Sequence, residues 1–293
     1  MSPTTNGHEM REALLFPGQG SQSADMVEAV ERHRPELLDL CRVEVGRDPF
    51  DALDGGTQYL QPALYCASIA LWAGAGSPLP ALVAGHSLGE LAALAAAGVF
   101  SEADGLRLAA VRGRAMQAAA AAGPEAGMLA LLGGEGEEAR ELAERNGAVV
   151  ANDNAPGQLV LSGPISRLEA ISLDAKRVGL KARRLPVAGG FHSPAMEPAV
   201  APFRRALGGI DLREPRVTVY SGVTARPFED FARQLVEALT KPVRWRETLL
   251  ALRDAGAERF VEVGPGKVLR NLAKRTVPDQ QSASLAQLEV ASA

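Results

Sequence analysis

The feature that most constrains the fold is the stretch ALVAGHSLGELAALAAAG, residues 81–98, which joins an apolar run to a helix-like run through GHSLG. GHSLG fits the pattern G-x-S-x-G, whose serine stands on a tight turn between a strand and a helix. Small residues flank the serine because the backbone there passes close to its neighbours. The stretch predicts a strand over 81–85, a helix from Ser87 to Ala97 and Ser87 as a candidate nucleophile. A glycine-flanked structural turn is the competing interpretation.

Elsewhere in the chain, short apolar runs alternate with helix-like segments. ALLFP (13–17) and RFVEVG (259–264) are further candidate strands, and PGKVLRNLAKR restarts a helix after the second of them. This alternation is typical of α/β architecture with a largely parallel sheet. A chain of 293 residues is long for one domain but suits one large domain that carries a smaller insertion.

The pattern changes between Gly127 and Gly190, where the segments follow the order β-α-β-β-α-β. Its strands are MLALLG, AVVANDN, QLVLSG and KARRLPVAG, and its helices are EEARELAERNG and ISRLEAISLDAKRVG. That order is the split-βαβ, ferredoxin-like pattern. We expect a small domain over residues 128–190, inserted into a catalytic domain that is formed by residues 1–127 and 191–293. The seam between two such domains is a favoured place for a ligand.

Composition excludes several kinds of partner. Apolar residues make up 46% and charged residues 23%, the formal net charge is −4, and the basic residues are scattered, so we expect no nucleic acid and no membrane surface as partners. Cys41 and Cys66 lack metal-type and redox-type spacing. No apolar run is long enough to span a bilayer and no signal-peptide pattern opens the chain, so we expect a cytoplasmic protein. The polar ends, 1–11 and 279–293, are expected to be loosely ordered.

A catalytic base for Ser87 has to come from elsewhere in the chain. Successive side chains leave a tight turn in different directions, so His86 cannot easily turn its imidazole back onto the serine hydroxyl. His8 lies in a polar terminus and His33 in a charged stretch, whereas His192 follows two glycines where the small domain returns to the large one. His192 is therefore the candidate base. A loop histidine that is hydrated by water is the competing interpretation.

A third group that orients the histidine is not evident as an Asp or Glu in the sequence. A backbone carbonyl can hold the second ring nitrogen equally well, although it carries no charge. The sequence therefore predicts a serine–histidine dyad.

Arg112 suggests which acyl group would bind. The helix-like segment 101–121 opens with a capping box of Ser101 and Asp104. Arg112 falls on its apolar stripe, which runs through Gly105, Leu108, Ala109 and Met116. An arginine in such a stripe is costly unless it meets an anion, and its planar fork suits a carboxylate. The anion is either a substrate carboxylate, hence a dicarboxylic acyl group, or an Asp or Glu of the protein in a buried ion pair.

FPGQGSQ, residues 16–22, follows the first candidate strand. Its glycines let the backbone of Gln19 approach a ligand, and the Gln19 N–H would complete an oxyanion hole with the N–H of Leu88. An ordinary tight turn or a phosphate-binding loop is the alternative, but the lysine of a P-loop is missing.

Nine motifs between roughly residues 13 and 275 carry a resemblance to a known family. In order they are LLFPGQGSQ, TQYLQPALY, GHSLGE, VRGRAMQ, ANDNAPGQLVLSG, FHSPAM, VTARPF, PVRW and FVEVGPGKVL. The chain thereby resembles malonyl-CoA:acyl carrier protein transacylases and the related acyltransferases of polyketide synthases. The resemblance implies an α/β-hydrolase-like large domain with a mostly parallel sheet and an inserted ferredoxin-like small domain. It also implies an acyltransferase that uses no metal and no cofactor; its substrates are a CoA thioester and a protein that carries phosphopantetheine.

Position by position, the resemblance assigns roles to the residues discussed above. It implies that Ser87 is the nucleophile, His192 the general base and acid, and Arg112 the partner of the malonyl carboxylate. Gln19 and Leu88 match the oxyanion-hole positions of the family.

Further positions match the family's substrate site. A backbone carbonyl just before PVRW, near Ala238, orients the histidine in the family. The remaining matches are substrate-binding positions, namely His86, Phe191, Gln61 and Asn154. Of these, His86 lines the site without acting as the base.

The reaction implied is a ping-pong transfer. Malonyl-CoA acylates the serine, CoA leaves, and the phosphopantetheine thiol of an acyl carrier protein takes the malonyl group. A monomer is expected. The pathway, fatty-acid or polyketide synthesis, and the particular carrier protein stay open.

Two departures from the family pattern and three alternative functions stay open as well. Phe191, directly before His192, resembles the malonyl-selective pattern of the family, but Gly189 supplies no side chain at its position in that pattern. This weakens the expected selectivity against a 2-substituted malonyl group. Gly222 stands where the family commonly has Asn. The alternatives are an acyltransferase for a substituted malonyl or another acyl unit, a thioester hydrolase acting on acyl carrier proteins, and the malonyl-transfer subunit of a malonate decarboxylase complex. Arg112 argues against the hydrolase, because a neutral acyl chain would leave its charge unpaired.

Overall fold

The computed structural model describes residues 10–134 and 136–285, and its largest element is a six-stranded sheet in the order β10-β9-β1-β2-β7-β8. Neighbouring strands are parallel from β10 to β7, and only β8 runs antiparallel. The predicted, largely parallel α/β sheet is therefore confirmed. The strands are β1 (Glu12–Phe16), β2 (Leu82–Gly85), β7 (Thr218–Ser221), β8 (Arg226–Pro227), β9 (Arg259–Glu262) and β10 (Gln281–Ser284).

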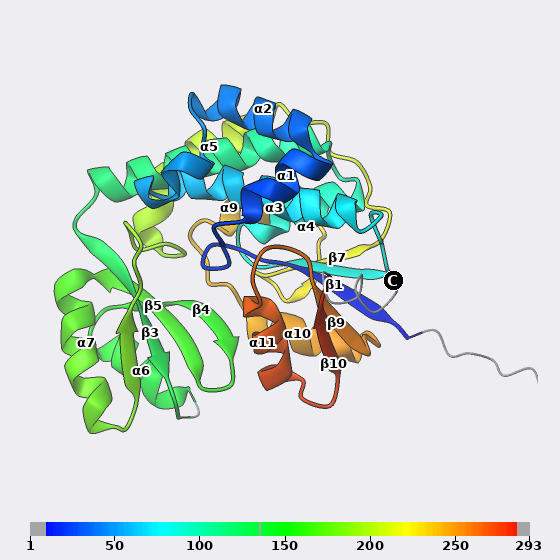
Figure 1. The fold of residues 1–293 in the computed structure, drawn as a ribbon. Coiled ribbons are helices and arrows are strands. Elements are labelled where there is room, and N and C mark those ends of the chain that lie inside the picture. The colour runs from blue at the N-terminus through cyan, green and yellow to red at the C-terminus, as the bar shows by residue number, and fades with distance from the viewer. Residues whose placement is uncertain (1–9, 135, 286–293) are drawn as a thin grey trace, which may run out of the picture.

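Helices cover both faces of this sheet (Figure 1). Successive residues of a strand point to opposite faces, and in β1 Leu14 and Phe16 join one core cluster whereas Ala13 and Leu15 join another. The first cluster packs under α1 (Met26–His33), α2 (Pro35–Val45), α3 (Thr57–Gly74), α4 (Gly89–Ala97), α5 (Glu102–Ala122), α8 (Glu197–Leu207) and α9 (Phe231–Glu237). The second packs against α10 (Trp245–Asp254) and α11 (Val268–Thr276). Short 3-10 turns span Phe50–Gly55 and Pro194–Met196.

A second sheet has the order β4-β5-β3-β6 and is antiparallel throughout. Its chain order is strand, helix, strand, strand, helix, strand, which is the predicted ferredoxin-like pattern. Its elements are β3 (Ala126–Leu132), α6 (Glu137–Arg145), β4 (Val149–Ala155), β5 (Gln158–Pro164), α7 (Ile165–Arg177) and β6 (Lys181–Arg184). The fold class is thereby confirmed, whereas the exact domain boundaries, 127/128 and 190/191, stay a prediction.

One strand prediction and the expectation for the tail need correction. The strand expected over 181–189 ends at Arg184, because Pro186 has no N–H to donate to the sheet. In the tail, which was expected to be loosely ordered, residues 281–284 form β10 and pair with β9. The rest of that expectation, on residues 1–9 and 286–293, lies outside the described residues.

The small sheet is joined to the large domain at β4. The N–H of Asp153 donates to the carbonyl of Val243 at 2.9 Å, and the N–H of Val243 donates to the carbonyl of Ala151 at 2.8 Å. These backbone bonds lie beside α10, so β4 borders the large domain.

Among the described residues, no helix is long and apolar enough to cross a membrane.

Candidate active site

Ser87 occupies a sharp turn between β2 and α4. Its backbone is left-handed, with φ 54°, so the helix begins at Gly89 and not at Ser87 as the sequence predicted. A Cβ on Gly85 would lie 2.1 Å from the carbonyl carbon of Gly89, and a Cβ on Gly89 would lie 2.0 Å from the carbonyl oxygen of Phe16. Both contacts are shorter than any side chain tolerates, so the two glycines are required for the turn.

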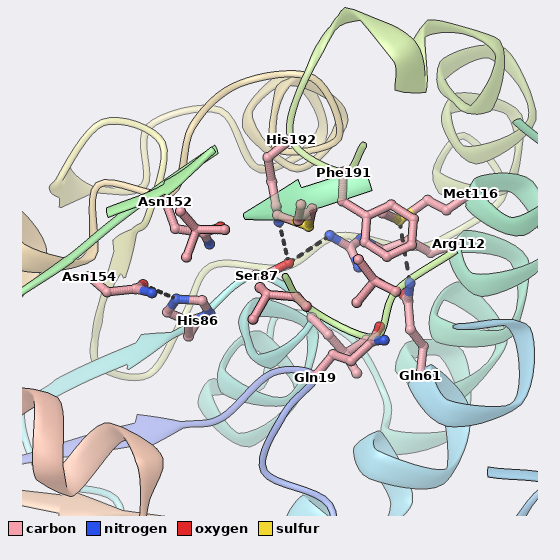
Figure 2. A pocket seen from close by; sticks show the side chains of 15 residues that line it. Gln19, Gln61, His86, Ser87, Arg112, Met116, Asn152, Asn154, Phe191 and His192 are labelled. Carbon is pink, nitrogen blue, oxygen red and sulfur yellow. Dashed lines mark hydrogen bonds between the residues drawn. The ribbon is translucent and has the colours of Figure 1, made fainter. Parts of the chain in front are cut away.

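His192 lies against this serine. Ser87 Oγ is 2.8 Å from His192 Nε2, and His192 Nδ1 is 2.8 Å from the carbonyl oxygen of Ala238. A carbonyl only accepts, so Nδ1 carries the proton and Nε2 accepts the serine hydroxyl proton. The structure thus brings together the two residues of the predicted dyad (Figure 2). The group that holds the ring is a backbone carbonyl.

His86 has a different partner, as expected. Its Nε2 lies 2.9 Å from Oδ1 of Asn154, and its ring meets Trp245 edge-on with 5.2 Å between the ring centroids. Figure 2 shows the imidazole turned toward Asn154 and away from the serine hydroxyl. Burial lowers the pKa of His86, with the bond to Asn154 opposing this shift. His86 lines the site beside the dyad without contacting Ser87 Oγ.

Arg112 reaches the same serine from α5. Its guanidinium donates to Gln61 Oε1 at 2.8 Å and to Ser87 Oγ at 3.1 Å, and the residue is only 4% exposed. Among the described residues, no carboxylate oxygen lies within 4.0 Å of the guanidinium. The alternative of a buried ion pair with the protein's own Asp or Glu therefore finds no partner.

Burial shapes the charges around Arg112. Burial lowers the pKa of Arg112 to about 10, and the nearby Glu90 partly opposes this shift. Glu90 is itself buried and accepts a bond from the N–H of Gly222 at 2.8 Å; burial raises its pKa to about 7. The positive charge of Arg112 at neutral pH is therefore poorly compensated within the protein.

The pKa of His192 is lowered to about 3, first by burial, then by the charge of Arg112 and by His86. The bond that Nδ1 donates to the carbonyl of Ala238 opposes this shift. At neutral pH the imidazole is uncharged, which is the form that accepts a proton.

The loop that carries Gln19 packs directly on the turn of Ser87. A Cβ on Gly18 would lie 2.4 Å from the carbonyl oxygen of His86, so only glycine permits this approach. No described acceptor bonds to the backbone N–H of Gln19 or of Leu88, and both residues line the same cavity. Free N–H groups beside a serine hydroxyl are the kind of donors that stabilise an oxyanion.

All nine residues singled out from the sequence line one cavity of about 130 Å³. Figure 2 shows that it lies between the end of β2, the middle of α5 and the strands of the small sheet. One wall is apolar and consists of Met116, Met128, Val160, Leu185, Val187 and Phe191. The sequence analysis missed Asn152, which lies on the same strand as Asn154 and two residues before it; the rule that alternate strand residues share a face would have found it.

Comparison with known proteins decides the family. A profile of the acyl transferase domain matches residues 44–290, most of the chain. This chain belongs to the acyl transferase domain family.

Individual relatives of this acyl transferase domain are similar over nearly its whole length. It is 38% identical to a malonyl CoA-acyl carrier protein transacylase of Synechocystis, over 96% of this chain and 98% of that protein. It is also 38% identical to the polyketide biosynthesis protein ThaF of Burkholderia thailandensis, over 97% of this chain but only 26% of that longer protein. A solved structure of acyl-carrier-protein S-malonyltransferase from Burkholderia pseudomallei superposes with a TM-score of 0.87 and 35% identity, covering 96% of this chain and 99% of that one.

One of the two departures from the family pattern, Gly189, has a structural explanation in this acyl transferase domain. A Cβ on Gly189 would lie 2.6 Å from Cβ of Ala120 on α5, and Gly189 does not line the cavity. Its missing side chain therefore lets α5 approach and does not widen the cavity. Gly222 donates its backbone N–H to Glu90, as any residue except proline could, and a Cβ there would make only an ordinary contact of 3.5 Å with the Glu90 carboxylate, so nothing in the structure explains this glycine.

Within the described residues, no group of three or more His, Cys, Asp or Glu side chains is placed to hold a metal ion.

Proposed function

We propose that this acyl transferase moves a malonyl group from malonyl-CoA to the phosphopantetheine thiol of an acyl carrier protein through an ester on Ser87. The observation that carries the proposal is the buried Arg112 guanidinium, which lies 3.1 Å from Ser87 Oγ and has no carboxylate of the protein in contact. A malonyl group on Ser87 would bring its free carboxylate to this guanidinium. The names of the Synechocystis and Burkholderia pseudomallei relatives support the same substrates.

In the first half-reaction, Ser87 attacks the thioester carbonyl of malonyl-CoA. Its proton passes to His192 Nε2, 2.8 Å away, while the new C–O bond forms and the carbonyl oxygen becomes an oxyanion. The N–H groups of Gln19 and Leu88 bind that oxyanion. The C–S bond then breaks, and the CoA sulfur leaves with the proton from the imidazolium.

The second half-reaction reverses these roles. The phosphopantetheine thiol gives its proton to His192, and the sulfur attacks the ester carbonyl of malonyl-Ser87. The C–O bond of the ester breaks, and Ser87 Oγ regains a proton from the imidazolium. The carbonyl of Ala238 holds the ring in position throughout, through its bond to Nδ1.

The remaining residues bind or shape the substrate in this proposal. Gln61 fixes one nitrogen of Arg112 so that the other nitrogens face the malonyl carboxylate. His86 and Asn154 form a hydrogen-bonded pair that lines the cavity. Phe191 limits the space for the acyl group on the apolar side of the cavity.

The proposal also covers the domain boundaries, the oligomeric state and the cellular compartment. We take the catalytic domain as residues 1–127 and 191–293, with residues 128–190 as the small domain, in a cytoplasmic monomer. A net charge of −4 and two buried cysteines support this setting, and size-exclusion chromatography tests the monomer. One relative is named a polyketide biosynthesis protein and another a malonyl CoA-acyl carrier protein transacylase, so the proposal is one chemistry that serves fatty-acid or polyketide synthesis.

The experiment incubates the purified protein with malonyl-CoA, methylmalonyl-CoA or acetyl-CoA and records its intact mass before and after addition of holo acyl carrier protein. We expect a malonyl adduct that moves to the carrier, no adduct on Ser87→Ala, and normal labelling of the control Ser101→Ala. A malonyl adduct on Ser87→Ala would disprove the assigned nucleophile. Release of free acid without loading of the carrier would favour the hydrolase instead.

A further inference from the structure

An unbroken chain of side-chain hydrogen bonds connects Arg112 to the loop of Gln19. Arg112 donates to Gln61 Oε1 at 2.8 Å, Gln61 Nε2 donates to Thr57 Oγ1 at 2.8 Å, and the Thr57 hydroxyl donates to Gln19 Oε1 at 3.1 Å. The chain therefore crosses from α5 through the first turns of α3 to the β1–α1 loop. Figure 2 shows its two ends, Arg112 and Gln19, on the same side of the cavity as Gln61.

Chemistry fixes the direction of the first two bonds in this chain, and in the third the Thr57 hydroxyl donates to Gln19 Oε1. A guanidinium can only donate, so it takes the amide oxygen of Gln61, which leaves the Gln61 amide nitrogen to donate. The Thr57 oxygen accepts that bond, and its single proton is then available for Gln19 Oε1. All three bonds point the same way, so each one polarises and strengthens the next.

Packing holds Thr57 in the middle of the chain. Thr57 and Gln61 are each 2% exposed. The backbone N–H of Thr57 donates to Gln117 Oε1 on α5 at 3.1 Å, and a Cβ on Gly113 would lie 2.8 Å from the carbonyl oxygen of Thr57. The start of α3 therefore packs against α5 at Gly113, the residue after Arg112. The Thr57 hydroxyl consequently has little freedom to choose another acceptor.

We propose that Thr57 is a positioning residue that couples the carboxylate site at Arg112 to the oxyanion donor at Gln19. This proposal rests on the proposed function. The Thr57 hydroxyl fixes the side chain of Gln19, and through it the backbone N–H that faces the reacting carbonyl. A carboxylate bound by Arg112 contacts one end of the same chain, so the groups that bind the carboxylate and the oxyanion share one set of hydrogen bonds.

The test measures acylation of Ser87 by malonyl-CoA in single turnovers, with rapid quenching and intact-mass detection, over a range of malonyl-CoA concentrations. Thr57→Val keeps the shape of the side chain and removes the hydroxyl, and Thr57→Ser keeps the hydroxyl. Losing one oxyanion donor costs about 100-fold or more, so misplacing one should slow acylation by about tenfold. We expect this loss in Thr57→Val with half-saturation by malonyl-CoA unchanged within about twofold, and recovery in Thr57→Ser.

A second variant tests the same bond from its other end. Gln19→Met removes the acceptor, keeps the backbone N–H, and should slow acylation as Thr57→Val does, so the proposal stays testable if Thr57→Val does not fold. The double variant should be no slower than either single one, because both remove one interaction. Wild-type acylation rates in Thr57→Val, equal losses in Thr57→Ser and Thr57→Val, or multiplying losses in the double variant would each overturn the inference. Failure of the wild-type protein to form any malonyl adduct would instead overturn the proposed function.

Discussion

Ser87 and His192 stand 105 positions apart in the chain, yet their side chains meet at 2.8 Å and both residues have left-handed backbone, with φ 54° and 55°. For residues with a side chain this conformation costs about 1–2 kcal/mol each. The two strained positions lie at one contact, one on the turn after β2 and one on the loop that leaves the small sheet. Two of the four described non-glycine residues with a left-handed backbone therefore lie where we place the chemistry; the other two are Ser77 and Ala225.

Relief of the strain at Ser87 should stabilise the protein. Glycine adopts φ 54° without the steric cost, whereas alanine keeps it, and both remove the hydroxyl. We expect Ser87→Gly to be more stable than Ser87→Ala by about 1 kcal/mol in urea or thermal unfolding, with no malonyl adduct in either variant. Equal stabilities would mean that the turn is not strained.

Arg112 should set the preference for a carboxylated acyl group. Arg112→Met removes the buried charge, and the loss of such a partner is worth about 3 kcal/mol, or roughly 100-fold. We therefore expect the ratio of kcat/KM for malonyl-CoA over acetyl-CoA to fall about 100-fold. The control is Arg107→Met on the same helix, whose exposed guanidinium pairs with Asp104 and Glu44. An unchanged ratio in Arg112→Met would reduce Arg112 to a structural role.

His192 should make folding sensitive to acid. Its pKa is lowered to about 3 in the folded protein, so between that value and about 6.5 the unfolded chain binds a proton that the folded chain does not. Stability is therefore full above about pH 6.5 and is lost as the pH falls. Between pH 7 and pH 5 we expect the wild-type free energy of unfolding to drop about 2 kcal/mol more than that of His192→Gln.

The comparison with His192→Gln cancels the contributions of other groups, including His86, whose pKa is also lowered. Urea unfolding at several pH values measures both proteins. Parallel curves would show that His192 is protonated as easily in the folded protein as in the unfolded chain.

Phe191, rather than Gly189, should limit the size of the acyl group. Phe191 lines the apolar wall of the cavity, whereas the position of a side chain on Gly189 is taken by Ala120. Room for one extra methyl group is worth about 1–3 kcal/mol, so we expect Phe191→Ala to raise acylation by methylmalonyl-CoA relative to malonyl-CoA by roughly tenfold.

The matched variant is Gly189→Ala. It should keep the ratio of the two substrates within about twofold and lose about 1–3 kcal/mol of stability, because the new methyl group overpacks against α5. Ala120→Gly added to it should recover stability. A changed substrate ratio in Gly189→Ala would return this position to the acyl pocket.

The sequence predicted those features that local patterns determine. The strands β1, β2 and β9 are short apolar runs, the Ser101 cap of α5 follows from its capping residues, and the side-chain oxygen of Ser101 does accept from the N–H of Asp104. The two glycines of the turn were explained by close backbone contacts, which the structure contains.

Features that depend on distant segments were not accessible in this way. QSAS at 281–284 carries no apolar signal, and it becomes β10 only because β9 offers an open edge. The helix start at Ser87 was wrong because the G-x-S-x-G pattern indicates a turn at the serine but does not give the first helical residue, which is Gly89. Thr57 was missed because its hydroxyl matters only through its partners on two other segments.

The bond from His192 Nδ1 to the carbonyl of Ala238 affects which amino acids position 238 can accept during evolution. A carboxylate in that place would be lost by a single change of codon. Every amino acid carries a main-chain carbonyl, so position 238 is free to drift in side chain while the histidine keeps its support. Random mutagenesis at this position should therefore return many active clones, limited by packing of a buried alanine and not by chemistry.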